Sequence, residues 1–106
     1  MATRVTKTSD SDLDRLGEAL ARYKADHPRA RIKVYRQNSV SLRARIIDPD
    51  FTGIDRGQRH ETIWRLIETL PEETQSQLSV LLLLTPEEAK RSFANLDFDH
   101  PIPSDL

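Results

Sequence analysis

The fold is decided by residues 31–47, which read RIKVYRQNSVSLRARII. Apolar residues recur here at every second position on either side of a short polar interruption: Ile32, Val34, Val40, Leu42, Ala44 and Ile46. This alternation is typical of amphipathic strands, because successive side chains of a strand point to opposite faces. Gln37 to Ser39 supply turn-forming residues, so the stretch predicts an antiparallel hairpin with one apolar and one basic face.

A helix is expected before the hairpin, from about Asp12 to Ala25. The residues that recur at helical spacing are Leu13, Leu16, Leu20 and Tyr23. Ser11 stands where an N-cap would, and acids follow it in the first turn, where the helix dipole favours them. Pro28 ends the helix, because proline cannot continue the backbone hydrogen-bond ladder.

A second helix is expected after the hairpin, from Gln58 to Leu70, beyond a loop over Phe51 to Gly57. Its apolar stripe is formed by His60, Ile63, Trp64, Ile67 and Leu70. Pro71 closes this helix. The polar run that follows, residues 72–77, is read as a connection to the next element.

Residues 78–84 are apolar except for Ser79, a pattern that predicts a strand buried on both faces. Thr85 and Pro86 begin a short last helix that reaches about Leu96. A helical crossover after a hairpin makes the third strand parallel to the second. We therefore expect an α/β (α+β) domain with a three-stranded mixed sheet, covered by helices on one face and partly open on the other.

The chain has 106 residues, enough for one hydrophobic core. We expect a flexible N-terminus at 1–10, a single domain at 11–96 and a loose C-terminal tail at 97–106. Its net charge of −1 predicts no general attraction to nucleic acid or membranes. No segment has the character of a signal peptide or membrane span, so a cytoplasmic location is expected.

The sequence contains no cysteine, which excludes disulfides, a thiol nucleophile and any cofactor cluster held by the chain's own thiolates. No cofactor is expected to bind to the chain alone. Ser39, Ser41 and Ser79 have no identifiable base near them, and the paired glutamates stand next to each other at helix ends. We therefore expect a binding protein and not an enzyme, and the sequence identifies no small-molecule substrate.

Four short motifs follow one another between Ile46 and Glu88. They are Phe51-Thr52-Gly53, Arg56-Gly57-Gln58-Arg59-His60, the apolar strand 78–84 and Thr85-Pro86-Glu87-Glu88. In their order and spacing they resemble the BolA-like family, and the resemblance extends over roughly residues 13–94. It implies an α-β-β-α-α-β fold like that of class II KH domains.

The resemblance also implies a function. BolA-like proteins pair with monothiol glutaredoxins, can share a [2Fe-2S] cluster with them in iron-sulfur or stress-related regulation, and some are described as transcriptional regulators. The expected partner-binding residues are Phe51, Gly53, Arg56, Arg59, His60 and Trp64. His60 is the candidate ligand for a shared cluster, although its place on the apolar stripe favours a structural histidine when the residues are considered alone.

Two departures from the family pattern stand out. The loop between the first two strands usually presents a histidine or cysteine, and Gln37 to Ser39 offer neither. Glu61 stands where a basic residue often follows the helix histidine, and Trp64 takes the place of a later aromatic residue.

The basic face of the hairpin supports a second interpretation. Residues 29–47 contain six bases and no acid. The candidates for binding nucleic acid are Arg31, Lys33, Tyr35, Arg43 and Arg45, on the sheet face expected to be open. The simpler interpretation is a solvated strand face whose charges prevent edge-to-edge association.

Overall fold

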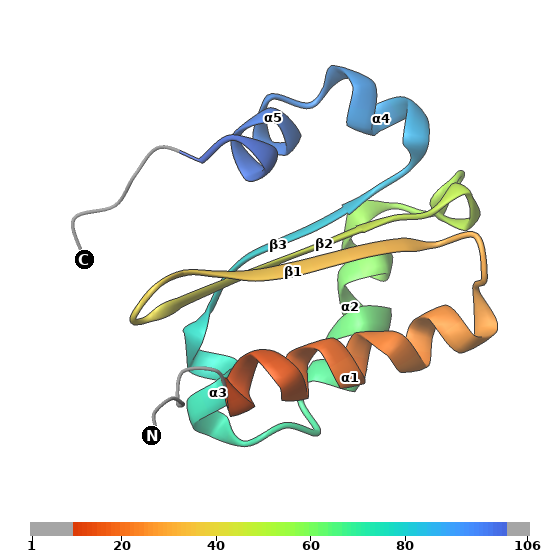
Figure 1. Ribbon diagram of the computed structural model, residues 1–106. Coiled ribbons are helices and arrows are strands. Elements are labelled where there is room, and N and C mark those ends of the chain that lie inside the picture. The colour runs from red at the N-terminus through yellow and green to blue at the C-terminus, as the bar shows by residue number, and fades with distance from the viewer. Residues whose placement is uncertain (1–9, 102–106) are drawn as a thin grey trace.

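A computed structural model describes residues 10–101 of the chain (Figure 1). Its elements are α1 (Ser11–Asp26), β1 (Arg31–Asn38), β2 (Ser41–Ile47), the 3-10 turn η2 (Pro49–Phe51), α2 (Arg56–Ile67), α3 (Glu72–Gln77), β3 (Leu78–Leu84), α4 (Pro86–Arg91) and α5 (Phe93–Asp99). The flexible segment expected at 1–9 and the end of the predicted tail, 102–106, lie outside the described residues.

The sheet has the order β1-β2-β3 and is mixed, as predicted. β1 and β2 are antiparallel, with Ile32 opposite Ile46, and β3 runs parallel to β2, with Leu83 beside Ile46. The hairpin turn lies one residue later than expected. Because the register shifts between Arg36 and Asn38, Val40 falls in the turn and is 56% exposed instead of packing in the apolar face.

Asp10, and not the predicted Ser11, caps α1. Its carboxylate accepts a hydrogen bond from the Leu13 backbone N–H at 3.1 Å, and it also accepts one from Arg36 of β1 at 2.6 Å. That contact with Arg36 lowers the pKa of the Asp10 carboxyl. Asp10 therefore belongs to the folded domain and not to a flexible lead-in.

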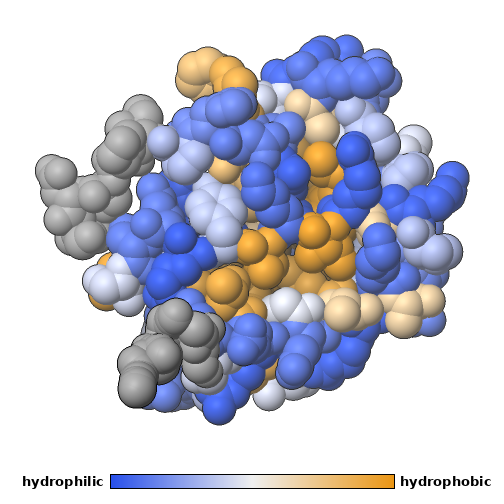
Figure 2. All heavy atoms as spheres, in the orientation of Figure 1, coloured by the Kyte–Doolittle hydropathy of each residue, from blue (hydrophilic) through white to orange (hydrophobic). Residues whose placement is uncertain are grey.

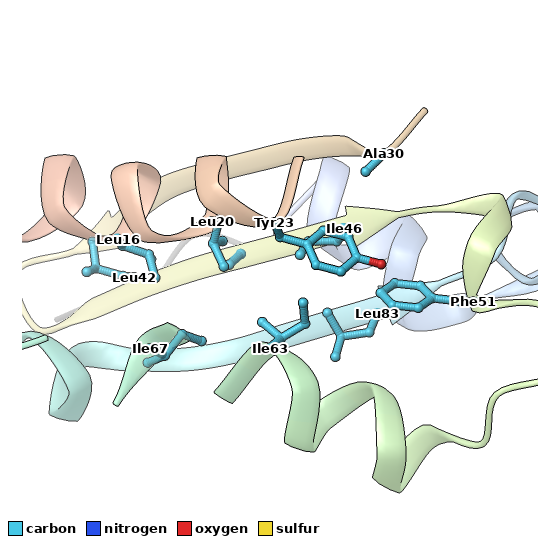
Figure 3. Packing of buried hydrophobic residues seen from close by; sticks show 11 residues of the cluster. Leu16, Leu20, Tyr23, Ala30, Leu42, Ile46, Phe51, Ile63, Ile67 and Leu83 are labelled. Atoms are coloured by element: carbon cyan, nitrogen blue, oxygen red, sulfur yellow. The ribbon is translucent and has the colours of Figure 1, made fainter. Parts of the chain in front are cut away.

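The core lies between one face of the sheet and the helices α1 and α2 (Figure 3). Its large, fully buried aliphatic side chains come from helix and strand alike: Leu16, Leu20, Leu42, Ile46, Ile63 and Ile67. Burying side chains of this size contributes about 1.5–3 kcal/mol each. This packing confirms the predicted core face of the hairpin and fixes the orientation of α2, on which the candidate site stands.

The polar run at residues 72–77 forms a helix, α3, which the residue pattern did not predict but which the α-β-β-α-α-β order implied by the resemblance includes. It begins after Pro71 and is tied to the start of α1 by two side-chain hydrogen bonds to Asp12. Thr74 donates to that carboxylate at 2.7 Å and Gln77 donates at 2.8 Å. A six-residue helix without an apolar stripe is held by such tertiary contacts and not by its own propensity.

The predicted last helix, from Thr85 to about Leu96, is two helices in the structure and extends further. It breaks at Ser92, which ends α4 and caps α5, and α5 continues to Asp99. Phe98 is 1% exposed and packs edge-on against Tyr35 at 5.0 Å between ring centroids. The predicted tail boundary after Leu96 is therefore wrong, because an aromatic anchor follows it.

α5 covers part of the sheet face opposite to α1 (Figure 1). The face shown in Figure 2 is mostly hydrophilic, with a strip of hydrophobic residues in its middle. Among residues 10–101, no helix combines the length and apolar character that crossing a bilayer requires.

Candidate functional site

The loop that leads into α2 begins with a tight turn at Gly53. Its φ of +82° lies in the left-handed region that side chains disfavour, which explains glycine at this position. Asp55 then caps α2 by accepting a hydrogen bond from the Gln58 backbone N–H at 2.9 Å. The turn and the cap together fix which side chains of the first helical turn face inward.

Arg59 faces inward and is only 5% exposed. Its guanidinium donates to the backbone carbonyls of Ile54 and Leu83 at 2.8 and 3.0 Å, and to both carboxylate oxygens of Glu88 at 2.6 and 3.2 Å. Glu88 also accepts the Thr85 backbone N–H at 3.0 Å, closing a capping box at the start of α4. The Arg59 contact, followed by the Thr85 hydrogen bond, lowers the pKa of the Glu88 carboxyl to about 2.

Phe51 is also internal, at 3% exposure. Its ring stacks on Tyr23, with centroids 5.8 Å apart, and lies 5.4 Å from the Arg59 guanidinium. Phe51 and Arg59 were expected to contact a partner, but their burial assigns them to the interior. Some residues of the motifs that carry the family resemblance therefore have a structural role. Arg59 in particular joins the loop before α2, the end of β3 and the start of α4.

His60 points outward instead, which corrects its predicted place on the apolar stripe. Arg59 occupies the inward position, and the stripe consists of Arg59, Ile63 and Ile67. The His60 ring stacks on the half-buried Trp64, with centroids 5.6 Å apart and planes 10° from parallel. The histidine is thus an exposed, oriented side chain and not a core residue.

A pocket of about 160 Å³ lies beside His60 and is lined by Arg56 and by residues 81–83 of β3. β3 is an edge strand of the sheet, so its leucines form an apolar floor at the margin of the fold. We call Gly53, Arg56, His60 and Trp64, together with this floor, the α2 face. It combines a cation, an imidazole and an aromatic ring around apolar surface, which is the composition of a small protein-docking site.

The predicted nucleic-acid residues lie on the other side of the sheet. We call Arg31, Lys33, Tyr35, Arg43 and Arg45 the basic face. Arg31 and Lys33 are exposed, whereas the side chains of Arg43 and Arg45 are only 14% exposed because α5 lies over them. These five residues therefore share one face of the hairpin, and α5, which carries two acids, lies against part of that face.

A third polar cluster, which sequence reasoning missed, joins the end of α1 to η2. His27 Nδ1 lies 3.0 Å from an oxygen of Asp50 and 3.6 Å from an oxygen of Asp48, and its ring stacks on Tyr23 at 4.0 Å. These three groups are close enough to hold a metal ion. His27 was expected to be a surface residue, and a separation of 21 positions or more along the chain hid its two carboxylate partners.

The same cluster is already filled by hydrogen bonds. The Tyr23 hydroxyl donates to the fully buried Asp48 at 2.6 Å, and Arg29 pairs with Asp50. Burial, and then the hydrogen bond to Asp48, raise the pKa of the Tyr23 hydroxyl well above its usual range. We interpret the cluster as a polar tie between α1 and η2, because each carboxylate already has neutral or cationic donors.

Comparison with known proteins adds evidence on the fold. No protein-family model matches the sequence, and no curated protein matches it. Among solved structures, the BolA domain of SufE1 from Arabidopsis thaliana aligns with a TM-score of 0.52 and 21% identity, over 76% of this chain and 99% of that one. BolA1 from Arabidopsis thaliana aligns with a TM-score of 0.51 and 19% identity, over 76% and 98%.

The fold is therefore that of a small α+β domain with a three-stranded mixed sheet, in the BolA-like class. The resemblance noted in the sequence is confirmed at the level of the fold. At this level of identity the likeness does not extend to activity or partners, which depend on the residues of the site itself.

Proposed function

We propose that this chain is a BolA-like binding protein that docks a protein partner through the α2 face. The observation that carries the proposal is the stacking of the exposed His60 on the half-buried Trp64, beside a pocket with a floor of leucines at the edge of the sheet. Aromatic and arginine side chains around apolar surface are enriched where proteins bind one another. Arg56 adds an exposed positive charge at the rim, which favours a partner with acidic groups there.

The partner we propose is a monothiol glutaredoxin, following the resemblance to BolA-like proteins. His60 would be this chain's single ligand to a [2Fe-2S] cluster shared with that partner. Within residues 10–101, the one grouping of potential metal ligands is His27, Asp48 and Asp50, which does not include His60. The chain therefore suits a one-ligand role only, with the partner supplying the other ligands.

The role we propose is not enzymatic, and we place it in the cytoplasm. The α2 pocket supports a binding role, because its lining combines Arg56 and His60 with three leucines and contains no carboxylate or hydroxyl side chain. A histidine without a neighbouring nucleophile or orienting carboxylate lacks the usual arrangement for acid–base or covalent catalysis.

The test is a titration of the isotope-labelled protein with a monothiol glutaredoxin, followed by amide NMR. The glutaredoxin is added once without its cluster and once loaded with [2Fe-2S]. We expect shifts in Gly53 and in α2 as far as Trp64, and a changed fluorescence of Trp64, the chain's one tryptophan. No shift at near-millimolar concentrations would refute the proposed partner.

Matched variants separate docking from ligation. Arg56→Glu should weaken binding of both forms of the partner at least tenfold, whereas Arg22→Glu, an exposed position on α1, should not. His60→Ala should remove the change in cluster absorption, whereas His100→Ala should leave it intact. A cluster spectrum unchanged by His60→Ala would exclude His60 as the ligand while leaving the docking proposal standing.

A further inference from the structure

The basic face and α5 form an interface between two parts of the same chain. Asp97 pairs with Arg43 at 3.2 Å, and Asp99 pairs with Arg45 at 2.8 Å and with Lys33 at 3.2 Å. Both acids belong to α5 and all three bases belong to the hairpin. The helix thus presents two negative charges to a face that has no acid of its own.

An aromatic ring lies between these charges. The Phe98 ring packs edge-on against Tyr35 at 5.0 Å and lies 4.9 Å from the Arg45 guanidinium. The Tyr35 hydroxyl also donates to the Phe98 carbonyl at 2.6 Å. An acid, a planar ring and a second acid therefore follow one another along the basic face, in the alternation of charge and ring that a nucleic-acid strand has.

The fit between α5 and the two arginines is incomplete. The Nε atoms of Arg43 and Arg45 are buried and have no hydrogen-bond partner. In both residues, Nη1 makes the hydrogen bonds to α5. A phosphate group offers several oxygens and can bind the Nε and Nη edges of a guanidinium together. The carboxylates of α5 leave the Nε atoms of both arginines unused, and a phosphate in their place could accept from Nε and Nη at once.

α5 is weakly attached apart from these contacts. It has seven residues and is joined to α4 through Ser92, and its outer side exposes Phe93 by 86% and Leu96 by 56%. A helix this short does not persist by itself in water. Its position therefore depends on Phe98 and on ion pairs that water and salt weaken.

We propose that the basic face is a binding surface for single-stranded nucleic acid, and that α5 covers it by imitating that ligand. Phosphates would take the places of Asp97 and Asp99, and a base would take the place of the Phe98 ring against Tyr35 and Arg45. An acidic helix from another protein is the competing occupant. The unpaired Nε atoms would suit either a phosphate or a carboxylate, and the aromatic contact favours the nucleic acid, because a base can stack where the Phe98 ring lies.

The experiment measures the binding of a fluorescein-labelled oligothymidylate of roughly 20 nucleotides by anisotropy, a length sufficient for a single-strand site. The test variant is Asp97→Asn/Asp99→Asn, which weakens the cover without removing a core side chain. Its control is Glu18→Gln/Asp26→Asn, which changes the net charge equally at exposed positions of α1. We expect the test variant to bind about tenfold more tightly than the control, because three ion pairs no longer compete.

Two further measurements locate the site. Adding Arg43→Gln/Arg45→Gln to the test variant should return binding to the level of the control, and Lys33→Gln, at an exposed position, should weaken it without affecting the fold. Amide shifts caused by the oligonucleotide should fall on β1, β2 and α5 and leave α2 unchanged. Shifts on α2 would overturn the proposal and leave the docking function to be tested separately.

Two other results would also overturn it. One is equal binding by the test variant and its control, since α5 would then not compete with the ligand. The other is labelled heparin binding as tightly as the oligonucleotide, since heparin carries charge without bases. That outcome would indicate a surface for an acidic partner and not for nucleic acid.

Discussion

The guanidinium of Arg59 and the carboxylate of Glu88 are joined by two hydrogen bonds, at 2.6 and 3.2 Å, although the two residues are 29 positions apart along the chain. The contact links the first turn of α2 to the first turn of α4 across the end of β3. Removing one partner of such a pair leaves the other without its counter-charge.

We expect Glu88→Ala to lower the free energy of unfolding by about 2–3 kcal/mol, because it leaves the nearly buried Arg59 without its charged acceptor. Urea unfolding monitored by Trp64 fluorescence measures the change. Glu87→Ala, at an exposed neighbouring position, is the control and should change stability by less than about 0.5 kcal/mol. Equal effects of the two substitutions would contradict the structural role of the pair.

The contact between Arg59 and Glu88 also predicts that the stability of the protein depends on pH. The pKa of Glu88 is lowered from 4.5 to about 2 in the folded protein. A lowered pKa means that the folded state holds the proton less tightly, so the contribution to stability is complete above pH 4.5 and is lost as the pH falls towards 2. Unfolding measured across this window should show a smaller loss in Glu88→Gln than in the wild type. A parallel loss in both proteins would contradict the assignment.

Two glycines should respond in opposite directions to alanine. Gly53→Ala should destabilise the protein by about 1 kcal/mol, because the φ of +82° is unfavourable for a residue with a Cβ. Gly17→Ala should stabilise it by about 0.5–1 kcal/mol, because Gly17 is within α1 and its added Cβ would meet Val34 at 3.8 Å, an ordinary contact. Thermal unfolding of both variants measures the two changes in stability. If both variants were stabilised, or both destabilised, the backbone environment described for one of the two glycines would be contradicted.

Phe98→Ala should release α5 from the sheet. The ring is almost fully buried, and removing such a side chain costs about 3–5 kcal/mol when the whole fold depends on it. Because α5 is short and is the last element of the described residues, we expect the loss to be local, with amide hydrogen exchange accelerating at residues 96–100 and remaining slow in α1 and β2. Phe93→Ala, at 86% exposure, should leave exchange unchanged. Faster exchange throughout the domain would contradict a separable α5.

The hairpin and the parallel third strand could be predicted because both follow from local patterns. Alternation at residues 31–47 identifies two strands, and the apolar run at 78–84 identifies the third. The length of the connection between them then determines the parallel pairing. The structure confirms all three strands and their order.

The candidate site was harder to predict, because the pattern of apolar residues on α2 assigned the inward position to the wrong one of two neighbouring residues. Arg59 takes the inward position that the apolar pattern assigned to His60, and its burial is explained by Glu88, which no local pattern connects to it. The position of α5 was missed because the acids and prolines after Leu96 resemble a tail. A usable signal was present: the bases at 29–45 and the acids at 97–99 complement one another in charge.

The arrangement of β3 has a consequence for solubility. Seven residues without charge or proline form an edge strand, and such a segment is prone to pair with copies of itself. Arg56 and His60 stand beside residues 81–83 and place polar groups next to this edge. The side chains proposed to receive a partner therefore also protect the free protein from aggregation, so substitutions that make the α2 face more apolar should promote self-association before they improve binding.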